Sequence, residues 1–154
     1  MQRKGCVFCG IARGEIQAYK IYEGRDYLAF LDIFPNTRGQ AVLIPKRHAG
    51  SIFSELGDKE LMNFIVAAKK VSNIIRRRLD VQRVNLVFEG TGVAHLHAKL
   101  YPTAGVSGKG TITYEHERVY MSRYKGYITT LLGPRASDAS LRRVQKEILG
   151  GGGK

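Results

Sequence analysis

The stretch GTGVAHLHAKLYP, residues 90–102, joins a glycine-rich turn to a run in which polar and apolar side chains alternate. Side chains of a β-strand point alternately to its two faces, so residues two apart share a face. The run therefore predicts a strand from Ala94 to Tyr101 with an apolar face in the core and a polar face on the open side. The polar face consists of His95, His97 and Lys99, and the apolar face of Leu96, Ala98 and Leu100.

The polar face of this strand carries groups suited to phosphoryl or nucleotidyl transfer. Neutral imidazole is both a nucleophile and a metal ligand. A protonated lysine such as Lys99 is a poor zinc ligand, but it can hold a phosphate oxygen or a developing negative charge. The adjoining EGTG turn, residues 89–92, can offer backbone N–H groups to an anion. The alternative is an ordinary amphipathic strand whose polar face happens to carry histidines.

Other short apolar segments predict a largely antiparallel sheet around this strand. They are bounded by glycine, proline and aspartate residues that favour turns. The expected strands cover residues 21–31 (two strands joined by a turn at Gly24 and Asp26), 41–44, 84–88 and 128–132.

Two segments predict amphipathic helices. Between Asp58 and Leu79, apolar residues recur at the spacing of one buried helix face, with Asp58 as the expected N-cap. Three arginines, residues 76–78, suit the C-terminal end of this helix, where its dipole favours cations. A last helix is expected to begin at Ser137 or Asp138. Its buried face consists of Leu141, Val144 and Ile148.

Length and composition fit one globular domain. The chain has 154 residues, of which 44% are hydrophobic and 25% charged. We expect a single α+β domain over residues 1–149, followed by a flexible glycine-rich tail over residues 150–154. No apolar run reaches the length of a membrane span, and the basic N-terminal residues precede no apolar run of a secretory signal. These features favour a cytoplasmic location.

The net charge is unusually positive. Lysine and arginine number 25 against 13 aspartate and glutamate residues, which gives +12 at pH 7. Such a surplus favours anionic partners such as nucleic acid, nucleotides or phosphorylated substrates. A solvated basic surface that serves solubility explains it equally well, because net charge does not say where the charge lies.

The two cysteines, Cys6 and Cys9, form the motif CVFC. In a cytosolic chain this spacing favours metal or redox chemistry over a structural disulfide. A thioredoxin-like redox motif needs a strand before it, and no strand precedes this pair. Metal is therefore the favoured interpretation, although the pair supplies only two of the four ligands of a zinc site.

Taken together, these segments resemble the histidine-triad (HIT) superfamily, whose signature is three histidines alternating with apolar residues near the end of a core strand. The matching run is HLHAKLYP, residues 95–102. CVFCGIARGEI, residues 6–16, resembles the N-terminus of zinc-bearing members, and YLAFLDIFPNTRGQAVLIPKRH, residues 27–48, resembles their next strand, loop and strand. GYITTLLGPRAS, residues 126–137, is a less diagnostic match.

The resemblance implies roles for particular residues. His97 matches the histidine that takes the α-phosphate as a nucleotidyl-imidazole intermediate, and Asp32 matches the acidic residue that binds the ribose hydroxyls. Further substrate contacts are expected from Ile33, Glu89 and Gly92. The implied zinc ligands, which make a closed structural site, are Cys6, Cys9, His48 and His95.

The chain departs from the family pattern in three places. Lys99 stands where a third histidine contacts the phosphate and helps the leaving group. Gln40 or a neighbour stands where a histidine commonly precedes the VLIP strand. The turn before the signature is short, so Gly92 replaces the serine or threonine that touches the phosphate. The galactose-1-phosphate uridylyltransferase branch also tolerates a non-histidine third position, so these changes affect substrate choice more than the nucleophile.

The predicted function is a zinc-containing hydrolase that cleaves nucleotides at an α-phosphate, with His97 and Lys99 as its catalytic residues. Dinucleoside polyphosphates or adenylylated small molecules are the implied substrates. The alternatives are a nucleotidylyltransferase with a phosphate acceptor, and a non-catalytic, zinc-stabilised module that binds nucleotides or nucleic acid. The resemblance also implies a homodimer, and no membrane partner is expected.

Overall fold

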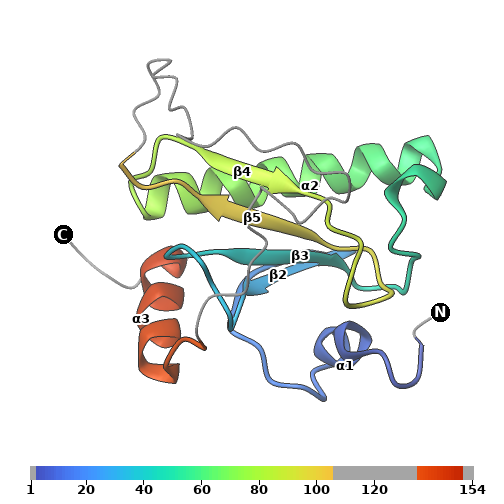
Figure 1. The fold of residues 1–154 in the computed structure, drawn as a ribbon, viewed down its shortest axis with the longest axis horizontal. Coiled ribbons are helices and arrows are strands. Elements are labelled where there is room, and N and C mark those ends of the chain that lie inside the picture. The colour runs from blue at the N-terminus through green and yellow to red at the C-terminus, as the bar shows by residue number, and fades with distance from the viewer. Residues whose placement is uncertain (1–2, 106–134, 151–154) are drawn as a thin grey trace, which may run out of the picture.

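The computed structural model describes residues 3–105 and 135–150. In these ranges five antiparallel strands form one sheet in the order β1-β2-β3-β5-β4, which confirms the predicted α+β class (Figure 1). The elements along the chain are α1 (Val7–Arg13), β1 (Lys20–Glu23), β2 (Tyr27–Leu31), β3 (Ala41–Pro45), a 3-10 turn (Phe53–Glu55), α2 (Asp58–Arg78), β4 (Val84–Val87), β5 (Ala98–Pro102) and α3 (Asp138–Leu149).

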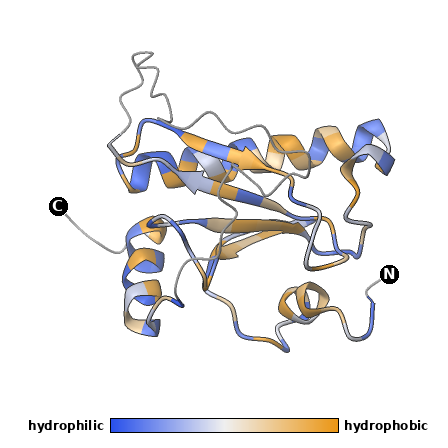
Figure 2. Ribbon diagram, in the orientation of Figure 1, coloured by the Kyte–Doolittle hydropathy of each residue, from blue (hydrophilic) through white to orange (hydrophobic). Residues whose placement is uncertain are grey.

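The two faces of the sheet pack against different helices. Side chains along each strand point alternately to the two faces, so each face buries a different set of residues. Ala41 and Leu43 of β3 join the larger core, together with α2 and α3, while Val42 and Ile44 join a smaller cluster with Ile11 of α1. Strands β2 and β3 are mostly hydrophobic, whereas α2 and α3 alternate hydrophobic and hydrophilic residues (Figure 2). The sheet is therefore a middle layer with helices on both sides.

The N-cap of one of the two predicted helices differs from the sequence prediction. Gly57 occupies the N-cap of α2 and Asp58 is the first helical residue, so the assignment of Asp58 as N-cap was wrong. Asp58 still favours the first turn through the helix dipole. Ser137 caps α3 as predicted, because its side chain accepts a hydrogen bond from the backbone N–H of Ser140 at 3.2 Å.

Strand β5 is shorter than the predicted strand, which was to begin at Ala94. The backbone N–H of His95 donates to Val93 O at 2.8 Å, and that of Leu96 donates to Ala49 O at 2.9 Å, so this segment leaves the sheet ladder. The side chains nevertheless keep their alternation. Leu96, Ala98 and Leu100 all lie in the larger core.

Helix α1 was not predicted, although the sequence carries signals for it. Cys6 is its N-cap, and Gly14 ends it in the left-handed region with φ +80°. Its side chains Phe8 and Ile11 pack on the smaller cluster of the sheet. The helix therefore covers the sheet face opposite to α2 and brings the CVFC motif to the end of β5 (Figure 1).

Several predictions fall on residues that the structure does not describe. The strand expected over residues 128–132 and the tail beyond Gly150 lie outside the described ranges, so the proposed domain limits of 1–149 stay a prediction. Within the described ranges, no helix combines the length and apolarity required to cross a membrane.

Gly39→Ala is expected to lower the free energy of unfolding by about 2 kcal/mol, because a side chain disfavours the left-handed region and would overlap a packed neighbour. Gly39 has φ +81°, and an added Cβ would overlap the side chain of Leu79. Gly50→Ala is the control, since open space surrounds a Cβ at Gly50. Urea denaturation of both variants measures the difference, and equal midpoints would contradict the prediction.

Candidate active site and metal centre

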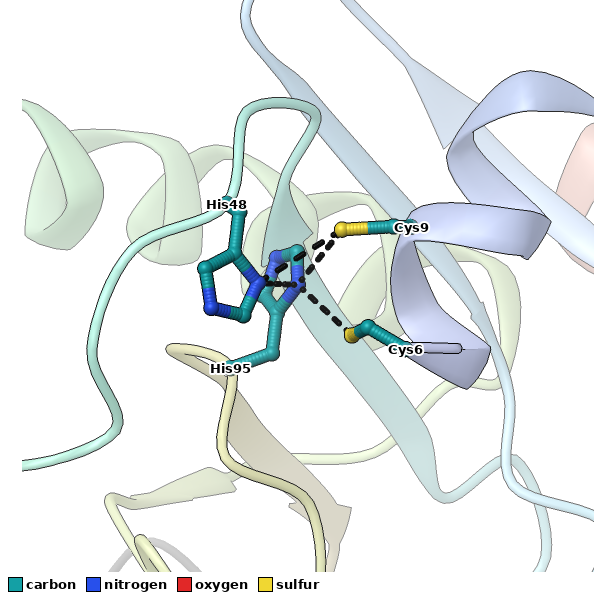
Figure 3. A group of neighbouring side chains, drawn as sticks. All are labelled: Cys6, Cys9, His48 and His95. Carbon is teal, nitrogen blue, oxygen red and sulfur yellow. Dashed lines mark hydrogen bonds between the residues drawn. The ribbon is translucent and has the colours of Figure 1, made fainter. Parts of the chain in front are cut away.

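Four side chains from three distant parts of the chain meet beside α1 (Figure 3). Cys6 and Cys9 come from the start of α1, His48 follows β3, and His95 precedes β5. Each offers one ligand atom, and all of these atoms lie within 4.8 Å of one another. The structure thus brings together the predicted zinc ligands.

Four of the six distances between these ligand atoms fit the edges of a tetrahedral zinc site. His95 Nδ1 lies 3.4 Å from Cys6 Sγ, 3.5 Å from Cys9 Sγ and 3.3 Å from His48 Nδ1. Cys9 Sγ lies 3.5 Å from His48 Nδ1. With ordinary zinc–sulfur and zinc–nitrogen bonds, the edges of a tetrahedral site measure about 3.3 to 3.8 Å. Two thiolates and two imidazoles are also the donor set of structural zinc sites.

Hydrogen bonding directs the His95 ring toward this cluster. Its Nε2 lies 3.0 Å from the carbonyl oxygen of Pro45, which can only accept, so Nε2 carries the proton and donates. The lone pair of Nδ1 then points at the two sulfur atoms (Figure 3). Burial lowers the pKa of His95 and favours the neutral ring, and burial raises the pKa of Cys9. A hydrogen bond from the second ring nitrogen to a backbone carbonyl, as His95 makes to Pro45, is typical of histidine ligands in metal sites.

A separate cavity of about 530 Å³ lies between α1, β2 and the segment that leads into β5. Its walls are mainly apolar, and its polar groups converge from three parts of the chain. The apolar wall includes Phe8, Ile11, Ile16, Phe30, Ile33 and Val42, and the polar lining includes Asp32, Glu89, Thr91, Gly92, His97 and Lys99. An apolar cavity with a few convergent polar groups is typical of a small-molecule site.

His97 lines this cavity with its orientation fixed from two sides. Its Nδ1 lies 2.7 Å from the carbonyl oxygen of His95 and therefore donates to it. The ring of Phe8 packs edge-on against the imidazole, with 5.3 Å between ring centroids. In the neutral ring, Nε2 is then the unprotonated nitrogen, and it is free to act as a nucleophile or base.

The prediction that His95, His97 and Lys99 lie on an open face was wrong for both histidines, which are buried. His95 is fully buried and belongs to the cluster of four candidate metal ligands, whereas His97 and Lys99 line the cavity. The physical reason is α1, which covers this face of the sheet and packs Phe8 against both histidine rings. One alternating run thus serves two neighbouring sites.

Asp32 is nearly buried at the end of β2, and two hydrogen bonds hold its carboxylate. Oδ1 accepts from the backbone N–H of Phe34 at 2.9 Å, and Oδ2 accepts from Gln40 Nε2 at 2.8 Å. Gln40 is oriented in turn because its Oε1 accepts from the backbone N–H of Asn36 at 2.8 Å. Ile33 is 40% exposed and stands on the cavity rim.

Lys99 does not face the cavity as an isolated cation. Its Nζ lies 2.6 Å from Glu89 Oε2, and the two side chains are only 12% and 18% exposed. Tyr101, two residues further along β5, is buried, and its hydroxyl has no hydrogen-bond partner in the described part of the chain. Burial, together with the negative charges of Glu89 and Asp32, raises the pKa of Tyr101 to about 12. The tyrosine hydroxyl therefore stays protonated beside two carboxylates.

Residues 13–104 match the sequence profile of the HIT domain. The chain belongs to the HIT domain family. The matched range covers Asp32, His48, His95, His97 and Lys99 and begins after the two cysteines. The family assignment therefore rests on the sheet and the signature segment, and the thiol ligands lie outside it.

Relatives of this HIT protein include an enzyme. It is 36% identical over 98 residues to the adenosine 5'-monophosphoramidase of Schizosaccharomyces pombe, a match that covers 63% of this chain and 73% of the relative.

Solved structures share the fold of this HIT protein. A hypothetical histidine triad nucleotide-binding protein from Sulfolobus tokodaii superposes with a TM-score of 0.70 at 23% identity, covering 94% of this chain and 89% of that one. A Zn-bound histidine triad family protein from Mycobacterium smegmatis superposes with a TM-score of 0.63 at 22% identity, covering 94% and 93%. At these identities the likeness concerns the fold.

Sequence reasoning missed two contributors to the site of this HIT protein. Phe8 orients His97, and its position in an apolar turn before Gly14 was a usable signal for helix α1. The hydrogen bond of Gln40 to Asp32 carried no such signal, because eight residues and a loop separate the two. In the sequence alone, Gln40 stands out only as a departure from the family pattern.

Proposed function

We propose that this HIT protein is a nucleotide hydrolase in which His97 forms a covalent bond to an α-phosphate. The observation that carries the proposal is the fixed orientation of His97, whose Nδ1 donates to His95 O while the ring lines a cavity that also contains Asp32 and Lys99. A nucleophile, a carboxylate and a cation in one apolar cavity provide the groups needed to bind a nucleotide and attack its phosphorus.

We propose that Cys6, Cys9, His48 and His95 hold one structural zinc ion. The ligand spacing supports this, as does the Zn-bound state of the relative from Mycobacterium smegmatis. When bound, zinc would tie α1 to the end of β5 and fix the position of His95. The backbone carbonyl of His95 also accepts the hydrogen bond from His97 Nδ1. One hydrogen bond therefore joins the cluster of four candidate metal ligands to the proposed nucleophile.

The reaction proceeds in two displacements. His97 Nε2 attacks the α-phosphorus, a nitrogen–phosphorus bond forms, and the bond from phosphorus to the leaving group breaks as the leaving atom takes a proton. Water then attacks the same phosphorus, loses a proton and releases His97 together with a nucleoside monophosphate. Lys99, which we place at the third signature position, stabilises charge on the phosphoryl oxygens, aided by backbone N–H groups of the turn at residues 89–92. Transfer to a phosphate acceptor in place of water is the alternative outcome of the second step.

Asp32→Asn is expected to weaken ribonucleotide binding about tenfold, because a charged acceptor for the ribose hydroxyls is lost. Its carboxylate is already held by Phe34 N–H and Gln40, so its oxygens have a fixed direction in the cavity. Calorimetric titration of AMP and of 2',3'-dideoxy-AMP measures the effect, and the variant should lose the preference for ribose. Asp26→Asn, at an exposed turn residue, is the control. Equal affinity of the wild type for both ligands would disprove the assignment.

A homodimer and a cytoplasmic location stay predictions. In the described part of the sheet, β4 is an outer strand, and Leu86 on it is 37% exposed. Met62 and Val66 of α2 are 60% and 66% exposed, which is unusual for apolar side chains. These features support a second copy of the chain as the partner at β4 and α2.

The activity is tested by incubating the protein with adenosine 5'-monophosphoramidate and following the release of AMP. The activity of the relative from Schizosaccharomyces pombe makes this the first substrate to try. Turnover that depends on His97 supports the proposal. AMP binding without turnover of any adenylylated compound would instead support a binding module.

A further inference from the structure

The charges that line the candidate nucleotide cavity are unusual for a site that receives phosphate. Among the described residues that line it, those that ionise at neutral pH are Asp32, Glu89 and Lys99. With a neutral imidazole at His97, these side chains sum to a charge of −1. The whole chain, by contrast, carries +12. The part of the cavity wall that the structure describes is therefore locally negative in a strongly basic protein.

Lys99, the one lysine or arginine among the described lining residues, is already paired with a carboxylate. Lys99 Nζ lies 2.6 Å from a Glu89 carboxylate oxygen, and both side chains are more than four-fifths buried. Asp32 is 9% exposed, so its negative charge is also poorly screened by water. A substrate phosphate must share Lys99 with Glu89, and each additional phosphate adds charge of the same sign as the two carboxylates.

We propose that Glu89 is a specificity-determining residue that discriminates against substrates with more than one phosphate on the nucleoside. The inference rests on the proposed nucleotide site. A single α-phosphoryl group can be held by Lys99 and by backbone N–H groups of the turn over residues 89–92. Polyphosphates, including dinucleoside polyphosphates, are repelled, and adenylylated compounds with an uncharged or cationic leaving group are favoured.

The position of Glu89 favours this role over one in folding alone. It lies two residues after the end of β4, at the entrance to the turn that lines the cavity, and its ion pair with Lys99 joins this turn to β5. Burial, together with the negative charges of this carboxylate and of Asp32, raises the pKa of Tyr101 to about 12. A carboxylate that only stabilised the sheet would have no reason to line the cavity.

The test compares the affinities of AMP with those of the α,β-methylene analogues of ADP and ATP, which cannot be cleaved at the α-phosphate. The quantity compared is the Kd of the ATP analogue divided by the Kd of AMP. We expect this ratio to be about 10 or more in the wild type and about tenfold lower in Glu89→Gln. Lys99→Gln should increase the ratio. The double variant Glu89→Gln/Lys99→Gln restores the net charge of −1 and should restore the ratio, and it avoids a buried unpaired ammonium group that could unfold the single variant.

Glu55→Gln is the matched control, because Glu55 is exposed in the 3-10 turn and does not line the cavity. If the wild type binds the ATP analogue as tightly as AMP, or if Glu89→Gln leaves the ratio unchanged, the inference is wrong while the proposed nucleotide site stands. If none of the three nucleotides binds, the proposed function itself fails and this inference fails with it.

Discussion

Cys9→Ala is expected to lower the free energy of unfolding by about 3 kcal/mol or more and to abolish stoichiometric zinc binding. Cys9 is fully buried, and its sulfur lies within 3.5 Å of a ring nitrogen of both His48 and His95. The free energy of binding a structural metal adds to that of folding, because the unfolded chain has no preformed site. The wild type should carry about one zinc per chain by elemental analysis, and thermal denaturation measures the loss of stability.

His97→Ala is the control for this zinc experiment. His97 is buried on the same segment as His95 but lies outside the ligand cluster. Its loss should leave the zinc content unchanged, whereas loss of Cys9 should not. A folded, stable wild-type preparation that contains no metal after expression with zinc would show that the site is not a zinc centre.

His97→Ala is also expected to reduce turnover of an adenylylated substrate by about 10⁴-fold or more, because the proposed nucleophile itself is removed. The ring is held by His95 O at Nδ1 and by Phe8, so a neighbouring group cannot take its place without rearrangement. Nucleotide binding should persist, since Asp32 and the apolar wall of the cavity remain.

Replacing Lys99 separates charge stabilisation from nucleophilic attack. Lys99→Ala should slow turnover on the order of 10²- to 10³-fold without abolishing it. This is the usual effect of removing one group that is positioned to stabilise negative charge in the transition state. Lys99→His should recover part of the activity.

Mass spectrometry of the reaction, quenched without acid, should locate the nucleotidyl group on His97. Wild-type turnover in His97→Ala, or a label on another residue, would contradict the mechanism.

The sequence predicted elements whose signals are local. The apolar spacing between Asp58 and Leu79 and the alternation between His95 and Leu100 both follow from the periods of a helix and a strand, which need no knowledge of distant residues. Helix α2 and the burial of Leu96, Ala98 and Leu100 are confirmed. The limits of β5 were wrong, because the carbonyl of Ala49, far away in the chain, draws Leu96 out of the ladder.

By itself, the sequence determined which residues are candidates for the chemistry: a CxxC pair, two alternating histidines, a lysine and an aspartate after an apolar strand. Only the tertiary structure decided how they divide. His95 joins cysteines 86 and 89 positions away in the chain, whereas His97, two residues later, lines the cavity. Likewise, Glu89 meets Lys99 only because β4 and β5 pair in a particular register, with Val87 opposite Lys99. Strand periodicity assigns a residue to a face, but its neighbours on that face come from other segments, and their positions depend on sheet register and on how α1 packs.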